Sequence, residues 1–188
     1  MKSAVDFSKW FVNKGLDNPT DTLNGNTKLQ KLLFFSWLIH YKKFGECLFD
    51  DDFHAFQNGP VVEKARQIYA HNYNSLIIPN ANELEISESG TYTEFGIEFT
   101  EKEITSLRLT EALFGDATAD ELTKISHNSP VWSKYHSIYM KSSSMCASGE
   151  RPSGMLSRMP KSELTEELRM IGNVISSYEY SLEHPDDE

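Results

Sequence analysis

One segment restricts the fold of this chain more than any other. Residues 28–41 read KLQKLLFFSWLIHY and are almost continuously apolar. Thr27 and Gln30 stand three residues apart, as in the capping box that begins a helix, and Gly45 is placed to end it. At 100° per residue the apolar side chains point almost all the way round this helix. A helix of this kind is normally central and buried, so the rest of the chain must surround it.

The helix leaves only a narrow polar stripe, made of Lys28, Lys31 and Lys42. Such a stripe could contact phosphate or an acidic strip of another protein. More often it is the solvated edge of an otherwise buried helix, and we expect that here.

Capping residues and turn signals place further elements on both sides of this helix. Helices are predicted at residues 4–14, 61–73, 101–114, 119–127, 130–141 and 163–182. A short strand is predicted at 53–56 and a hairpin within 76–99. We expect a mobile loop at 142–154 and an acidic tail at 183–188. The pattern indicates a single domain over residues 1–188, of the α+β class and mainly α-helical: a compact helical domain with a small β element.

Charge is distributed unevenly along the chain. The 188 residues hold 18 Lys and Arg against 28 Asp and Glu, a formal net charge of −10. Residues 1–45 have seven Lys and three Asp, whereas the remainder carries 25 of the acidic residues. Affinity for nucleic acid depends on basic side chains that displace counterions, so most of this surface should repel DNA and attract a basic partner. Solubility alone is the other explanation of the excess acid.

Composition excludes several protein classes. The two cysteines, Cys47 and Cys146, form no C-x-x-C pair, which argues against zinc ribbons and redox motifs and favours a reducing, cytoplasmic setting. No apolar run approaches the roughly 18 residues that a membrane span needs, so we expect neither secretion nor membrane insertion.

No known catalytic signature is present in the sequence. The glycine patterns of the P-loop, the Rossmann fold and the nucleophile elbow are missing, and no histidine belongs to a catalytic motif. His40 lies on the apolar helix four residues after Ser36, and we expect a buried hydrogen-bonded pair. Asp50, Asp51 and Asp52 alternate faces in an extended segment, which favours a solvated acidic turn over a metal site. We therefore expect a protein that is not an enzyme and needs no cofactor or metal.

Two sequence blocks resemble a known family. The first is Thr27, Lys28, Leu29, Gln30, Lys31, Leu32 and Leu33, and the second is Asn58, Gly59, Pro60, Val61 and Val62. Together they are similar to the signature of the Panacea domain, the SocA-like antitoxin family that is also described as phage-associated GepA-type proteins. A later block, from Glu121 to Trp132, resembles the family's leucine, histidine and Pro-Trp positions. The resemblance covers residues 4–140.

Two positions depart from the family pattern. Phe56 stands where the family usually has tryptophan, and Val131 separates Pro130 from Trp132, which tend to be adjacent. Gly59 and Pro60 read as architecture, since Gly tolerates positive φ and Pro fixes its own φ.

The resemblance implies an antitoxin that neutralises a cognate toxin encoded by the adjacent gene. Family partners include toxins of the small alarmone synthetase type that act on tRNA, and some members resemble adaptors that deliver a toxin to a protease. A toxin acting on tRNA needs a basic surface, which an acidic antitoxin complements. The alternatives are a proteolytic adaptor, a DNA-binding autoregulator that uses Lys28, Gln30 and Lys31, and, third, a metal-assisted hydrolase.

The acid run and nearby aromatics are the candidate contacts with the partner. Acidic side chains speed encounter. Aromatic residues are core residues by default, although they also dominate interface hot spots. The candidate partner-binding residues are Asp50, Asp51, Asp52, Phe53, Phe56, Tyr69, Tyr73 and Trp132.

Overall fold

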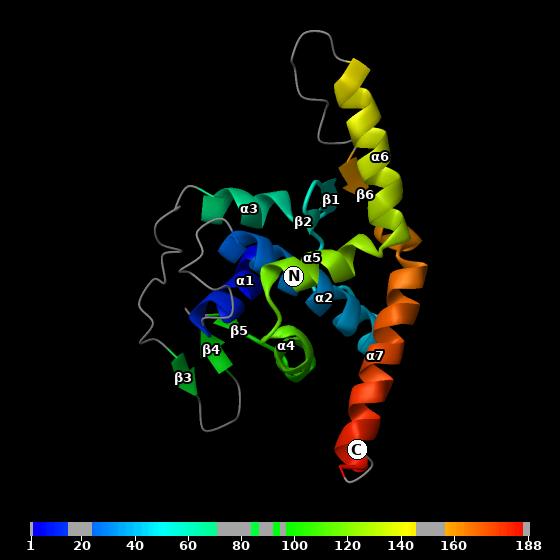
Figure 1. The fold of residues 1–188 in the computed structure, drawn as a ribbon. Coiled ribbons are helices and arrows are strands. Elements are labelled where there is room, and N and C mark those ends of the chain that lie inside the picture. The colour runs from blue at the N-terminus through cyan, green and yellow to red at the C-terminus, as the bar shows by residue number, and fades with distance from the viewer. Residues whose placement is uncertain are drawn as a thin grey trace.

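The fold is built around one helix, α2 (Asn24–Phe44). The structure is a computed structural model that describes residues 2–14, 24–70, 84–86, 92–94, 97–145 and 157–185. Helices α1 (Ala4–Asn13), α3 (Glu63–Ala70), α4 (Glu101–Phe114), α5 (Ala119–His127) and α7 (Thr165–Glu183) all contact α2 (Figure 1). The predicted class, α+β and mainly α-helical, is confirmed.

The burial of α2 is also confirmed, because Leu29, Leu32, Leu33 and Ile39 are fully buried. The predicted start of the helix is wrong. It begins at Asn24, so Thr27 lies inside it and forms no N-cap, and the Gln30 side chain is free to contact another element. Gly45 ends the helix as predicted, with a φ of 69° and its N–H donating to the carbonyl of Tyr41 at 2.8 Å.

Two small antiparallel sheets flank the helices. In the first, β1 (Phe53–Phe56) lies between β2 (Gly59–Val61) and β6 (Arg158–Met159). In the second, the order is β3 (Leu84–Ile86), β4 (Tyr92–Glu94) and β5 (Ile97–Glu98), which places a hairpin within 76–99 as expected. The predicted strand at 53–56 is confirmed. The predicted helix start at Val61 is wrong, since Val61 pairs with His54 in the first sheet.

The helices after the sheets follow their local signals closely. Helices α4 and α5 have the predicted bounds, and each is capped by a threonine and the glutamate three residues later. Helix α6 (Pro130–Met145) begins as predicted, with the N–H of Trp132 donating to Oγ of Ser129 at 3.0 Å, but continues to Met145. A short 3₁₀ helix, η2 (Lys161–Glu163), precedes α7.

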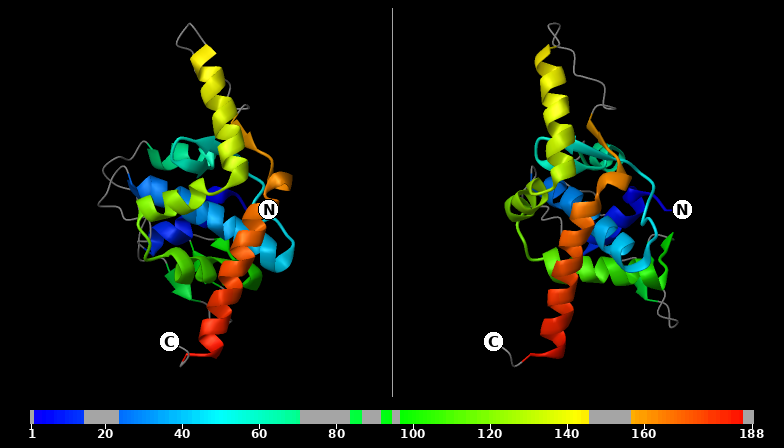
Figure 2. Two further views of the ribbon diagram at one scale, coloured as in Figure 1. Left: turned by 45° about the vertical axis from the view of Figure 1, so that its right-hand side comes forward. Right: turned by 90° about the vertical axis from the view of Figure 1, so that its right-hand side faces the viewer.

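Helices α6 and α7 run along one side of the molecule and extend beyond its body in opposite directions (Figure 2). Residues 71–83 and 146–156, with Tyr73 and most of the expected loop, lie outside the described residues. Among the helices of the described residues, none combines the length and the apolar character that a membrane crossing requires.

Candidate partner interface around the β1–β2 hairpin

The hairpin between β1 and β2 is fixed by the close approach of its turn to α2 and α5. Gly59 has a φ of 99°, a conformation that side chains with a Cβ rarely adopt. A Cβ on Gly59 would lie 2.6 Å from Nζ of Lys31 and 2.5 Å from Oγ of Ser126. The backbone angle therefore favours glycine at this position, and a Cβ there would displace the Lys31 and Ser126 side chains.

Lys31 is buried beneath this hairpin, which corrects the prediction of a solvated stripe. Its side chain is fully buried and Nζ donates to the carbonyl of Pro60 at 3.2 Å. Desolvation of the amine lowers its pKa from 10.5 to about 7. Lys28 is likewise buried and donates to the carbonyl of Gly115 at 2.6 Å, whereas Lys42 is exposed. Lys31 thus links α2 to β2, and Lys28 links it to the end of α4.

Gln30 provides a second link between the two sequence blocks that resemble the family. The N–H of Val62 donates to Oε1 of Gln30 at 2.8 Å, and the Gln30 amide donates to Oδ1 of Asn26 at 3.2 Å. The K-L-Q-K block therefore holds the G-P-V block in place through Gln30 and Lys31. Because these polar side chains face inward, α2 cannot present them to base edges in the way that the DNA-binding alternative expected.

Three aromatic rings stack beside the hairpin, and we call them the histidine–tryptophan stack: His127, Trp132 and His136. The ring centroids of His127 and Trp132 are 3.9 Å apart, and those of Trp132 and His136 are 4.9 Å apart. Trp132 donates from Nε1 to the carbonyl of Phe56 at 2.9 Å, and His136 donates from Nδ1 to that of Ala55 at 3.2 Å. These bonds tie α6 to β1.

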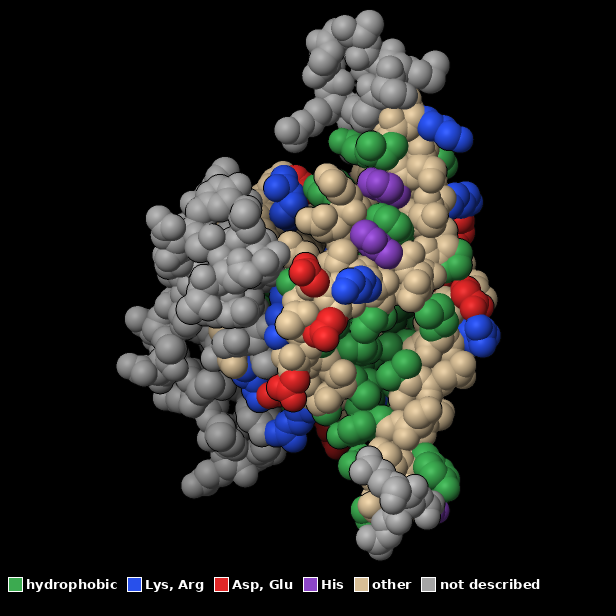
Figure 3. All heavy atoms as spheres, viewed as in Figure 1, with side chains coloured by type: hydrophobic (Ala, Val, Ile, Leu, Met, Phe, Trp, Pro, Cys, Tyr) green, Lys and Arg blue, Asp and Glu red, His purple; other side chains and the backbone are tan. Residues whose placement is uncertain are grey.

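The stack lies at the surface where α5 and α6 meet, and Figure 3 shows histidine side chains on this face. His127, His136 and Phe56 are partly exposed, while Trp132 is 9% exposed. Desolvation, followed by the positive charge of Lys31, lowers the pKa of His127, partly offset by a backbone hydrogen bond with Gln57. Sequence reasoning missed both histidines as members of this cluster, although the spacing of four residues between Trp132 and His136 was a usable signal.

The aromatic residues that were predicted to contact the partner lie in different environments. Trp132 of the stack meets the backbone carbonyl of Phe56, whereas the Phe56 ring lies beside the His54 ring, at 6.2 Å between centroids, and 5.6 Å from the guanidinium carbon of Arg66. Phe53 is fully buried and packs against Phe34, Trp37 and Phe49, so its ring offers nothing to a partner in this conformation. The side chain of Tyr69, like Tyr73, lies outside what the structure describes.

The three aspartates have separate roles. Asp51 accepts from the N–H of Ala4 at 2.7 Å and so caps α1, and Asp52 pairs with Arg158 at 2.8 Å. Asp50 is exposed. The run is thus partly structural and not simply a solvated turn.

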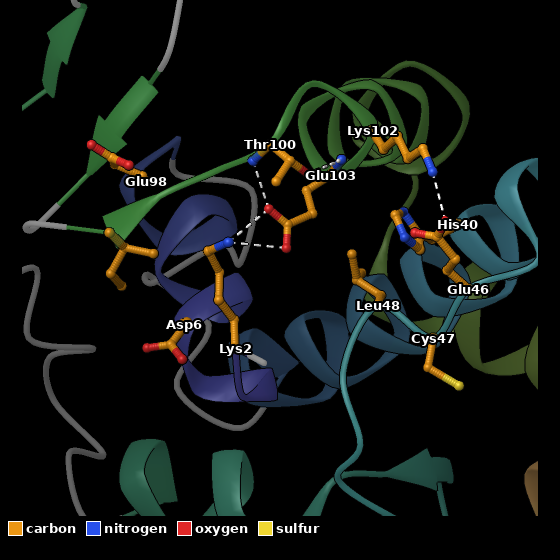
Figure 4. A pocket seen from close by; sticks show the side chains of 11 residues that line it. Lys2, Asp6, His40, Glu46, Cys47, Leu48, Glu98, Thr100, Lys102 and Glu103 are labelled. Carbon is orange, nitrogen blue, oxygen red and sulfur yellow. Dashed lines mark hydrogen bonds and ion pairs between the residues drawn. The ribbon is translucent and has the colours of Figure 1, made fainter.

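A polar cavity with a volume of about 580 Å³ lies between the start of α1, the end of α2 and α4 (Figure 4). Two ion pairs line it, since Lys2 contacts Glu103 at 2.8 Å and Lys102 contacts Glu46 at 2.6 Å. His40 bonds to Oγ of Ser106 at 2.9 Å. The predicted partner, Ser36, is wrong because its hydroxyl donates to the carbonyl of Leu33. Burial lowers the pKa of His40, which fits a structural role.

The segment that makes the hairpin contacts matches a known protein family. Residues 29–133 match the family described as antitoxin SocA-like, Panacea domain. Neither curated proteins nor solved structures give a match. The matched segment begins within α2, contains the hairpin and ends just after Trp132, so it includes Gln30, Lys31 and most of the histidine–tryptophan stack. As it also covers more than half of the chain, this protein belongs to the SocA-like antitoxin family with a Panacea domain.

Proposed function

We propose that this protein is the antitoxin of a two-gene toxin–antitoxin pair and that it neutralises its toxin by direct contact. The family match supports the antitoxin role. The observation that carries direct contact is a partly exposed aromatic surface, which we call the aromatic cluster: Phe56 of β1 and the neighbouring histidine–tryptophan stack, whose α6 side chains are bonded to the backbone of β1. Preformed aromatic surfaces lose little conformational entropy on binding and are typical of interface hot spots.

Charge supports the same function. Exposed acid on a chain with a net charge of −10 favours encounter with a basic partner, such as a toxin that binds tRNA. No step of catalysis by this chain is needed, because occlusion of the toxin's basic surface is sufficient to stop it.

The test is co-expression with the product of the adjacent gene. We expect growth inhibition by that product to be relieved and the two proteins to co-purify. Phe56→Ala should abolish rescue and weaken the complex at least about tenfold, the usual effect of losing a hot spot. Tyr41→Ala is the matched control, since Tyr41 is also a partly exposed aromatic, stacked on Trp37 at 5.1 Å, and it should rescue normally.

Two outcomes would oppose direct neutralisation. Rescue without a detectable complex, or rescue only in cells with an active protease, would assign the protein to the adaptor class. Equal rescue by Phe56→Ala and Tyr41→Ala, with both proteins folded, would remove the aromatic cluster from the interface.

A further inference from the structure

An apolar groove separates α5 from α7 on the same face of the molecule. Its volume is about 360 Å³, and α2 forms its base with Phe35 and Leu38. Its rim includes Ile125 of α5 and Val174 of α7, each 41% exposed. Figure 3 shows hydrophobic side chains gathered in this hollow below the histidines. The groove is wide enough for one or two side chains of a partner, not for a whole helix.

A buried carboxylate also lines the groove. Glu167 is only 4% exposed, and its Oε1 accepts from Oγ of Ser129 at 2.5 Å and from the N–H of Val131 at 3.2 Å. Its other oxygen, Oε2, is buried without a hydrogen-bond partner among the described residues. An unsatisfied buried carboxylate oxygen is costly, and a donor that reaches it from outside gains the most.

The chemistry of the groove selects its occupant. Apolar walls accept an aliphatic stem, and the free oxygen of Glu167 accepts a hydrogen bond from the head of that stem. Arginine combines both features, and its guanidinium is less strongly hydrated than an ammonium group, so its burial costs less. The acidic surface independently favours a basic partner.

We propose that this groove receives an arginine side chain of the toxin, whose guanidinium donates to Oε2 of Glu167 while its stem packs against the groove walls. The inference rests on the proposed function, because it names the chemistry by which the same partner is held. The groove is then a second contact with the toxin, in addition to the aromatic cluster, and lies on the other side of α5.

The first experiment uses no toxin, so its failure is distinguishable from failure of the proposed function. Butylguanidinium, which has the head and stem of arginine, is titrated against the full chain, and the methyl resonances of Leu38, Ile171 and Val174 are followed by NMR. We expect butylguanidinium to bind about tenfold more tightly than butanol, the effect of a charge-assisted hydrogen bond.

Glu167→Gln is the decisive variant. The Gln carbonyl can still accept from Ser129 and Val131, while its amide places donors where Oε2 was, so the variant should fold with an unchanged melting temperature. It should lose the preference for butylguanidinium and retain binding of butanol. Equal affinities for the two probes in the wild type, or an unchanged preference in Glu167→Gln, would overturn the proposal.

The second experiment uses the purified product of the adjacent gene. Glu167→Gln and Val174→Arg should each weaken the complex at least about tenfold. Ile68→Arg is the matched control, as Ile68 is 47% exposed on α3 and gains the same charge, and it should change affinity less than about twofold. Weakening by Val174→Arg without weakening by Glu167→Gln would refute an arginine occupant, and normal binding by both would exclude the groove.

Discussion

At the residue scale, two separate constraints act at Gly59, one from the backbone angle and one from the space around it. Their energetic costs can be compared. Its φ of 99° excludes most side chains, and a Cβ there would collide with Lys31 and Ser126, which are both buried. Gly45 also has a positive φ, 69°, but a Cβ there would meet nothing within 4 Å. Substitutions at the two glycines therefore distinguish the energetic cost of backbone strain from the cost of steric exclusion.

We expect Gly45→Ala to reduce the free energy of unfolding by about 1 to 2 kcal/mol, the cost of the left-handed conformation. Gly59→Ala should cost about 2 to 4 kcal/mol, because overpacking adds to the strain. Urea denaturation of both variants provides the measurement. Equal losses would mean that the hairpin can move away from α2 without cost.

Lys31 makes stability depend on pH. Its pKa in the folded protein is about 7, whereas the unfolded chain keeps a lysine pKa near 10.5. Between these values the unfolded state holds a proton that the folded state has released, so the free energy of unfolding rises with pH. This contribution is lost as pH falls through about 7.

Methionine has no titratable proton, so the Lys31→Met variant serves as the reference for the pH dependence. We predict that the stability of the wild type relative to Lys31→Met rises by about 2 to 3 kcal/mol from about pH 7 to about pH 9. Urea unfolding at several pH values tests this, and the difference between the two proteins cancels contributions from other groups. A constant difference would show that the buried amine stays charged.

At the scale of elements, the sequence predicted those features that are decided locally. The starts of α4 and α5 follow from threonine–glutamate pairs three residues apart, and Gly45 ends α2 by its own conformation. The burial of α2 followed from its apolar circumference. These signals act within about one helical turn, so they can be read from a short window of sequence.

Features that depend on distant partners were not predictable in this way. Lys31 finds its acceptor at Pro60 and Lys28 at Gly115, while His40 bonds to Ser106 of another helix. Glu167 lies in the first turn of α7, where an acid is favourable, and nothing nearby in the sequence indicates that Ser129 donates a hydrogen bond to it. Long-range packing decides whether such polar residues face inward.

The role of α2 can be tested with a pair of identical substitutions. Leu33→Ala should lower the free energy of unfolding by about 2 to 5 kcal/mol, since Leu33 is fully buried and truncation leaves a cavity. Leu182→Ala removes the same atoms from a residue that is 63% exposed on α7, and should cost less than about 0.5 kcal/mol. Similar melting curves for the two variants would contradict the central position of α2.

At the scale of the whole molecule, charge and shape act on different steps of association. The aromatic cluster and the groove form close contacts, so they govern mainly how long a complex lasts. Net charge acts at longer range, before contact, and so governs how often partners meet. The acid run contributes to this step only through its exposed member, because Asp51 caps α1 and Asp52 pairs with Arg158.

The final prediction concerns the rate of this encounter. If acidic charge steers the protein to a basic toxin, the association rate constant should fall at least about tenfold from about 0.02 M to about 0.5 M salt, while dissociation changes much less. Asp50→Asn should slow association about twofold at low salt, since two charges about 10 Å apart in water interact by about 0.4 kcal/mol.

Asp116→Asn is the control for position. Asp116 is also exposed, but it follows Gly115, whose carbonyl binds Lys28 of α2, whereas Asp50 follows Phe49, whose carbonyl binds Trp37 farther along the same helix. Lys28 and Trp37 are about 14 Å apart along the helix axis, so the two acids lie beside different parts of α2. Stopped-flow measurements should show slower association for Asp50→Asn and little change for Asp116→Asn. If the wild type and Asp50→Asn associate at the same rate at every salt concentration, the segment before β1 takes no part in the encounter.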